Sequence, residues 1–201
     1  MKRFYRRLLV ASIIAGVGLC GAMAATAQSA ADGTQRDVKQ QQRIEQGLKS
    51  GQLSTAEAAR LERGQAQVDR LQAHALRDGS LSAAEQARLS AAQNRQSRTI
   101  HAERHDGVGG NPQSRSSRLM QRDVARDVHQ RARIAHGVQS GALTAHETAR
   151  LEARQAHAAQ VEQRAASDGH VGPHEQRHIQ HVDQRNSRSI YRKKHNARVV
   201  G

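Results

Sequence analysis

Hydrophobic residues recur along the chain at the spacing of helix faces. One apolar stripe with heptad-like spacing occurs twice, at Leu61, Val68, Leu71 and Ala75 and again at Leu151, Ala158, Val161 and Ala165. A second stripe also occurs twice, at Leu89, Ala92 and Ile100 and at Ile179, Val182 and Ile190. Residues at these intervals share one side of an α-helix. The pattern therefore predicts an all-α protein, with helices near 35–49, 55–77, 83–104, 121–139, 145–167 and 173–195.

The second half of the chain repeats the first at a shift of ninety residues. Residues 36–105 align with 126–195 without a gap, and about 27 of the 70 positions are identical. Self-similarity of this kind is the mark of a structural repeat. The absence of gaps indicates that packing fixes helix lengths and turns in both copies.

A turn signature lies between the predicted helices. Glycine is followed two residues later by an aliphatic residue, then by Ser or Thr, and then by Glu three residues further on, at Gly51-Leu53-Ser54-Glu57, Gly79-Leu81-Ser82-Glu85 and Gly141-Leu143-Thr144-Glu147. The fourth copy, Gly169-Val171-Gly172-Glu175, lacks the hydroxyl but adds Pro173. Glycine ends a helix in the left-handed conformation, and the hydroxyl with the later Glu forms a capping box. We expect four helix–turn–helix junctions.

These elements define two tandem units, each an antiparallel helical hairpin or a three-helix unit. We assign them to residues 34–105 and 119–196, joined by a Gly- and Ser-rich flexible linker at 106–118 and followed by a basic tail at 197–201. Because alanine fills many seam positions, each contact is weak. Marginal stability or self-association into a homo-oligomer is expected.

The N-terminus differs from the rest of the chain. Residues 1–27 combine a basic start, an apolar run and an Ala25-Thr26-Ala27 end, which together predict a secretory signal peptide. Cleavage after Ala30 and retention of the segment as a membrane anchor are the alternatives. Removal of the segment would take away Cys20, the only cysteine, and leave no transmembrane segment. We expect a periplasmic or secreted protein.

The mature chain would be strongly basic. Its formal net charge is +14, and loss of the four cations of the signal segment leaves +10. Candidate anion-binding residues are Arg95, Arg98, Arg185, Arg188, Arg192, Lys193 and Lys194. Arginine forks suit carboxylates and phosphates. For an exported chain with few aromatic residues these partners are anionic envelope components or client proteins, rather than nucleic acid. The alternative is a solvated basic surface that maintains solubility.

Histidines gather near the C-terminus. His174, His178 and His181 share one helical face and are candidate ligands for a transition metal. The same segment spells the HExxH pattern of zinc proteases, but Glu175 is already the expected capping residue. Surface histidines without a ligand are the alternative. We predict no catalytic residues, no organic cofactor and a protein that is not an enzyme.

Two short resemblances concern the turns. The phrases RDGSLSAAE and SDGHVGPHE resemble the second half of an EF-hand calcium loop, but His74 and Leu76 stand where the loop ending at Glu85 requires oxygen ligands, which argues against calcium. The phrases LSTAE, LSAAE and LTAHE resemble the LTxxQ motif of periplasmic stress chaperones of the Spy/CpxP type, with Glu in place of Gln. That resemblance implies a basic cradle for unfolded clients or a sensor partner.

Overall fold

The protein is all-helical, as predicted, and the computed structural model describes residues 18–196, with side chains from residue 29 onward. No strand occurs among the residues described. The helices are α1 (Gly18–Ser50), α2 (Thr55–Ala75), α3 (Ala83–Glu103), α4 (Arg115–Gln139), α5 (Ala145–Ala165) and α6 (Pro173–Lys194). All six helices end within two residues of their predicted ends.

Helix α1 begins well before the predicted residue 35. It is continuous from Gly18, and Ala30 and Ala31 are already buried in the core. The segment ahead of residue 35 is rich in alanine, which favours a helix, and α1 continues through Asp32-Gly33, a pair that is typical of turns. The described part of the predicted signal peptide, 18–27, belongs to this helix, whereas 1–17 and the tail at 197–201 lie outside the described residues.

Helix α4 also begins earlier than predicted, inside the segment assigned as linker. Ser114 is its N-cap, and the Ser114 hydroxyl accepts a hydrogen bond from the amide of Ser117 at 3.1 Å. The remainder of the predicted linker contacts the first turn of the protein. The amide of Gly110 donates to the carbonyl of Gly51 at 2.9 Å. A Cβ at Gly110 would lie 2.6 Å from the Leu53 carbonyl oxygen, so this close contact requires glycine.

The four predicted junctions have the expected geometry. Gly51, Gly79, Gly141 and Gly169 all have positive φ, between 69° and 89°. Complete capping boxes start α2, α3 and α5. In each box the hydroxyl of the N-cap Ser or Thr accepts a hydrogen bond from the backbone amide of the Glu three residues later. The carboxylate of that Glu accepts a hydrogen bond from the backbone amide of the N-cap residue. At α6 only the Glu half exists, because Gly172 offers no side chain.

Loss of one hydroxyl cap should have a measurable cost. We expect Thr144→Ala to lower the free energy of unfolding by about 1 kcal/mol, because the Glu147 amide loses its acceptor. Urea unfolding followed by circular dichroism measures the change. Gly172→Ser, which supplies the missing hydroxyl, should instead raise stability by a few tenths of a kcal/mol. Equal destabilisation by both variants would contradict the capping account.

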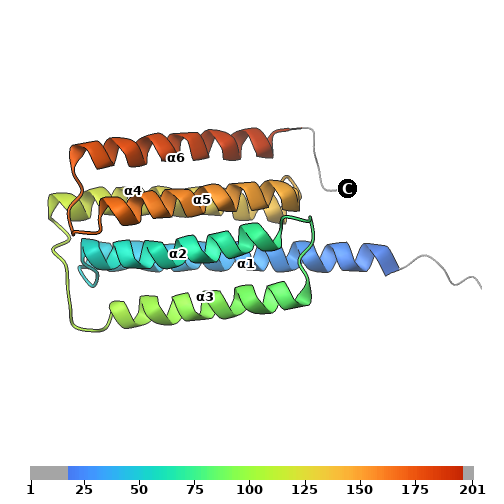
Figure 1. The fold of residues 1–201 in the computed structure, drawn as a ribbon, viewed down its shortest axis with the longest axis horizontal. Coiled ribbons are helices and arrows are strands. Elements are labelled where there is room, and N and C mark those ends of the chain that lie inside the picture. The colour runs from blue at the N-terminus through green and yellow to red at the C-terminus, as the bar shows by residue number, and fades with distance from the viewer. Residues whose placement is uncertain (1–17, 197–201) are drawn as a thin grey trace, which may run out of the picture.

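The helices form a central bundle of four with one further helix on each side (Figure 1). α1, α2, α4 and α5 make up the centre, α3 packs on α1 and α2, and α6 packs on α4 and α5. The most extensive contacts join α2 to α5 and α1 to α4, and in both pairs the helices run in opposite directions. Each pair joins equivalent helices of the two units. The repeat in sequence is therefore an approximate twofold repeat in space.

Both clusters of buried apolar residues are shared by the two units. Each of the two clusters of buried apolar residues draws on both units, so that Ile44 and Leu48 belong to the same cluster as Met120 and Val124. Small buried residues such as Ala59 on α2 and Ala158 on α5, each 1% exposed, belong to the same cluster and permit close helix packing. The described helices of the two units therefore pack against each other around shared clusters of buried apolar residues. Within 18–196, no helix has the length and apolarity to span a bilayer.

Candidate functional sites

Six acidic side chains lie in the centre of the four-helix bundle. They come from all four central helices and form two groups of three, Asp37, Asp69 and Glu152, and Glu62, Asp127 and Glu162. Each of the six is at most 2% exposed. Within each group the carboxylate oxygens approach within 4.8 Å of one another. Carboxylates this close in a low-dielectric interior cannot all be ionised without a compensating cation.

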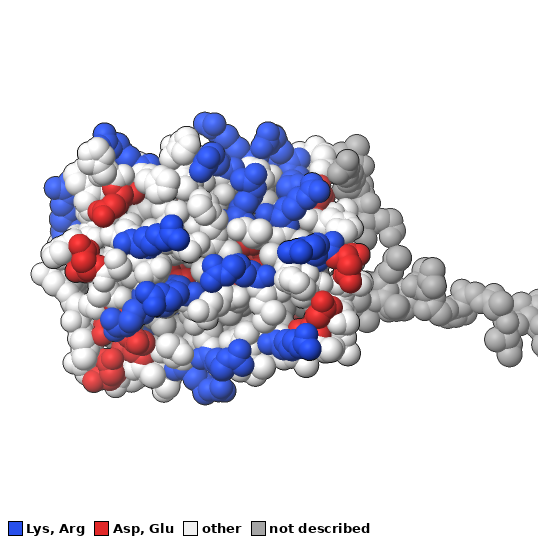
Figure 2. Space-filling model, viewed as in Figure 1, with Lys and Arg blue, Asp and Glu red and all other residues white. Residues whose placement is uncertain are grey.

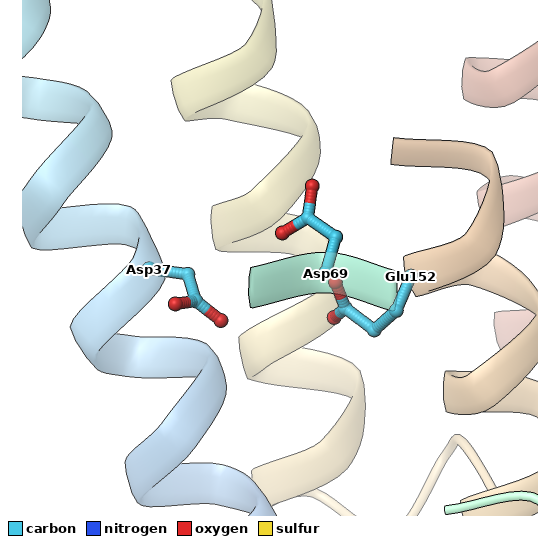
Figure 3. Close-up of side chains that lie close together, drawn as sticks. All are labelled: Asp37, Asp69 and Glu152. Atoms are coloured by element: carbon cyan, nitrogen blue, oxygen red, sulfur yellow. The ribbon is translucent and has the colours of Figure 1, made fainter. Parts of the chain in front are cut away.

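The first group contains its own cation. Asp37 on α1, Asp69 on α2 and Glu152 on α5 converge between the helices (Figure 3). The guanidinium of Arg131, 2% exposed, donates to Asp69 Oδ1 at 2.6 Å and to Oδ2 at 2.8 Å. Gln93 donates to Asp37 Oδ1 at 2.8 Å. We call this set the Arg131 cluster.

Burial dominates the titration of the Arg131 cluster. The pKa of Asp37 is raised to about 7, first by burial and then by the charge of Asp69, while Arg131 and Gln93 oppose the rise. Burial, followed by the charges of Asp69 and Asp37, places the pKa of Glu152 well above its ordinary value. Ionisation of all three carboxylates is therefore unfavourable even beside the Arg131 guanidinium.

The second group, Glu62, Asp127 and Glu162, has no cation bonded to it, although the charge of Arg131 acts on Glu62 and Asp127, and we call it the open-charge cluster. All three side chains are 0% exposed. Gln41 donates to Glu62 Oε1 at 2.6 Å. The second Glu62 oxygen and both oxygens of Asp127 and of Glu162 have no hydrogen-bond partner. Five buried carboxylate oxygens of this cluster are therefore without a hydrogen-bond partner.

The pKa values of the open-charge cluster are also raised. Burial raises that of Glu62 to about 7. Burial and then the charge of Asp183 place the pKa of Asp127 well above the ordinary range, and burial and then the charge of Asp127 do the same for Glu162. The ionised form is unfavourable unless a cation enters the cluster.

A groove lined by arginine lies on the surface of the second unit. Its volume is about 620 Å³, and its walls come from α4, α5 and α6. The lining residues are Arg133, Arg154, Arg185, Ser187, Arg188, Tyr191 and Arg192. Figure 2 shows Lys and Arg side chains spread across this face of the molecule, with many gathered over α5 and α6 and the acidic ones mostly towards the two ends. We call this the arginine groove.

The cations of the arginine groove are available to a ligand. Arg133 is held in place by bonds to the Ser187 hydroxyl at 2.8 Å and carbonyl at 3.2 Å. The guanidinium groups of Arg154, Arg185, Arg188 and Arg192 make no ion pair or hydrogen bond within the described part of the chain. A neighbouring hollow of about 650 Å³ shares Arg154 and Arg192 and adds further polar residues, Arg150, His157, Ser189, Lys193 and Asn196. No acidic residue lines either hollow.

The first unit lacks an equivalent concentration of charge. Arg154 replaces Gly64 and Arg192 replaces Ala102 at the equivalent positions. The backbone carbonyl of Arg154 accepts from Asn186, which fixes α6 against α5 beside the groove. In unit 1 a Cβ at Gly64 would lie 2.0 Å from Gln96, so that glycine lets the glutamine pack there. The arginine groove is therefore a property of unit 2.

The predicted anion-binding residues fall into separate places. Arg185, Arg188 and Arg192 line the arginine groove, and Lys193 lines the adjoining hollow. Lys194 instead lies with its Nζ 3.4 Å from His136 Nδ1 and lines neither. Arg95 and Arg98 are exposed on α3, which lies on the opposite side of the bundle from α6 (Figure 1).

The three predicted histidine ligands are exposed on α6. His174 contacts Arg177, with Nδ1 3.0 Å from the guanidinium, and His174 and His178 border a shallow hollow with Glu175. Three groups of close ligand atoms occur in residues 29–196, and all of them consist of carboxylates. A histidine metal site on α6 stays a prediction.

The buried acids were not identified from the sequence, although the repeat contains a usable indication of them. Five pairs of acidic residues are identical in both units. Two pairs are the capping glutamates of α2, α5, α3 and α6, and the pair Asp78 and Asp168 accepts amide bonds in turns. The two pairs without a local role are Asp37 with Asp127 and Glu62 with Glu152, all in the core. Sorting repeated acids by local role would have singled them out.

No family model, curated protein or solved structure matches the chain. The resemblances to EF-hand loops and to the Spy/CpxP type therefore stay predictions.

Proposed function

We propose that the protein is an exported, non-catalytic helical protein that binds phosphate-bearing anionic lipids of the cell envelope through the arginine groove. Its export is inferred from the signal-like N-terminal sequence. The observation that carries the proposal is a set of four arginines that line one hollow and whose guanidinium groups have no partner among the described residues. Guanidinium forks match phosphate oxygens in geometry and charge.

The composition of the groove favours a lipid headgroup over a flexible acidic protein. Tyr191 is 59% exposed at the groove, and an exposed tyrosine suits the boundary between water and a membrane. The stems of the arginines and of Lys193 supply apolar contact next to their charges. Anionic lipid surfaces attract each nearby cation by about 1 kcal/mol. Acidic client proteins are the competing ligand that the experiment has to separate.

Vesicle binding tests this proposal. The double variant Arg154→Gly with Arg192→Ala places the unit 1 residues in the groove. We expect it to weaken binding to phosphatidylglycerol vesicles about 10- to 30-fold, because two cations lose their attraction to the anionic surface. Cosedimentation at low and moderate salt measures it, with phosphatidylcholine vesicles as the uncharged reference.

The matched control removes two equivalent charges elsewhere. Arg95→Ala with Arg98→Ala on α3 should change vesicle binding less than about threefold, because these residues lie outside the groove. Equal loss in both double variants would indicate a general charge effect and refute the groove as the site. Binding of polyglutamate but not of vesicles would refute the lipid proposal and indicate that acidic client proteins are the ligand.

A further inference from the structure

The two buried carboxylate clusters are related by the sequence repeat. A shift of ninety residues converts Asp37 into Asp127, Glu62 into Glu152 and Gln41 into Arg131. Each cluster therefore contains the repeated Asp from one unit and the repeated Glu from the other. The clusters are two versions of one arrangement, and their differences show what each version lacks.

The difference lies in charge compensation. In the Arg131 cluster a buried guanidinium lies against Asp69. In the open-charge cluster the equivalent side chain is Gln41, which donates one amide bond to Glu62 and carries no charge. The third acid is Glu162, at the position equivalent to Gln72. One cluster thus has a guanidinium bonded to a carboxylate, whereas no cation is bonded to the three carboxylates of the other.

We propose that the open-charge cluster is a binding site for one hard divalent cation, with Glu62 from α2, Asp127 from α4 and Glu162 from α5 as its ligands. Their oxygens lie within 4.8 Å of one another, a separation that one ion can bridge. Five of the six oxygens have no other partner. The cation occupies the role that the guanidinium of Arg131 fills in the related cluster.

The ligand chemistry selects the class of ion. Every candidate ligand atom is a carboxylate oxygen, and no histidine or cysteine belongs to the cluster. Oxygen-only sites suit Mn²⁺, Ca²⁺ and Mg²⁺, whereas Zn²⁺ and Cu²⁺ prefer nitrogen or sulfur. A fully enclosed site disfavours Mg²⁺, which retains several water molecules. Mn²⁺ and Ca²⁺ are therefore the expected ions, with binding of one per chain.

The site also joins the two units, because Glu62 belongs to the first and the other two ligands to the second. An ion there cross-links α2, α4 and α5 at the centre of the shared core. Binding should therefore raise thermal stability, by about 5–10 °C in Tm at a cation concentration 100 times Kd.

The experiment titrates chelator-treated full-length protein separately with Mn²⁺, Ca²⁺, Mg²⁺ and Zn²⁺. Calorimetry and the Mn²⁺ electron paramagnetic resonance signal report stoichiometry and affinity, and Tm reports coupling to the fold. We expect one Mn²⁺ or Ca²⁺ per chain. Glu162→Gln should weaken binding at least about tenfold through loss of one carboxylate ligand. Gln41→Arg, which copies the Arg131 cluster, should abolish binding while the protein remains folded.

Two control variants locate the ion. Glu152→Gln alters the Arg131 cluster, and Asp106→Asn alters a third, partly exposed acidic group formed with Glu57 and Glu103. Both should retain the stoichiometry and affinity of the parent. The proposal is overturned if no saturable binding occurs, if Gln41→Arg still binds as the parent does, or if Asp106→Asn removes the bound ion.

Discussion

Replacement of Arg131 by glutamine is expected to lower the free energy of unfolding by about 3–5 kcal/mol, the cost of breaking one partner out of a buried ion pair. Arg131 is 2% exposed and binds both oxygens of Asp69, itself 0% exposed. Without the guanidinium, Asp69 would face Asp37 and Glu152 with no cation in the cluster. Urea unfolding at neutral pH measures the loss.

The repeat supplies the matched control for this variant. Gln41 of the first unit is equivalent to Arg131, and Ala159 of the second unit is equivalent to Asp69. The double variant Arg131→Gln with Asp69→Ala reproduces that combination and removes both the cation and the stranded carboxylate. We expect it to recover most of the lost stability, because replacing a buried pair is far less costly than breaking it. A loss below about 1 kcal/mol in the single variant would contradict the pair's structural role.

Local chemistry explains why the junctions were predictable from sequence. Capping depends on side chains three residues apart and on a glycine in the left-handed region, so no tertiary information is needed to locate Ser54 with Glu57 or Thr144 with Glu147. The predicted starts of α1 and α4 are wrong. Ser114 lies in the predicted linker yet caps α4, and α1 continues through Asp32-Gly33, a pair that is typical of turns.

Tertiary packing explains what the sequence could not provide. The alanine seam of α2 would fit a partner in its own unit as well as α5, and only the complete set of contacts selects α5. Glu62 follows Leu61 directly and Asp69 follows Val68, so a single amphipathic stripe assigns both acids to its solvent side. In the bundle α2 is covered on a wider arc, and both acids are buried.

The arginine groove was also only partly predictable from the sequence. Arg185, Arg188 and Arg192 recur at helical spacing on α6, so their shared face was predictable. Arg133 and Arg154 come from α4 and α5 and join them only because α6 packs across those two helices. A single-helix pattern finds one wall of a groove, and the fold supplies the others.

The stability of the cation-free protein should fall as pH rises from about 4 to 7, by about 2–3 kcal/mol between pH 5 and pH 8 from Asp37 alone. The pKa of Asp37 is about 7 in the folded protein, raised by burial and by the charge of Asp69 against the opposing charges of Arg131 and Arg36, compared with an ordinary value of 3.8. The folded state therefore binds more protons than the unfolded state across this interval, and the favourable contribution present below pH 4 is lost as Asp37 ionises. Glu152 faces the same space, and its raised pKa acts in the same direction.

Urea midpoints measured in chelator at several pH values test this dependence, and Asp37→Asn supplies the control. Asparagine has the shape of the protonated acid and can still accept the bond from Gln93. We expect the variant to gain stability over the parent at pH 8 and to show a shallower pH dependence, with little difference between the two at pH 4. A parent protein whose stability does not fall between pH 5 and pH 8 would contradict a raised folded-state pKa for these carboxylates, because an unshifted or lowered pKa leaves this interval without a contribution from them.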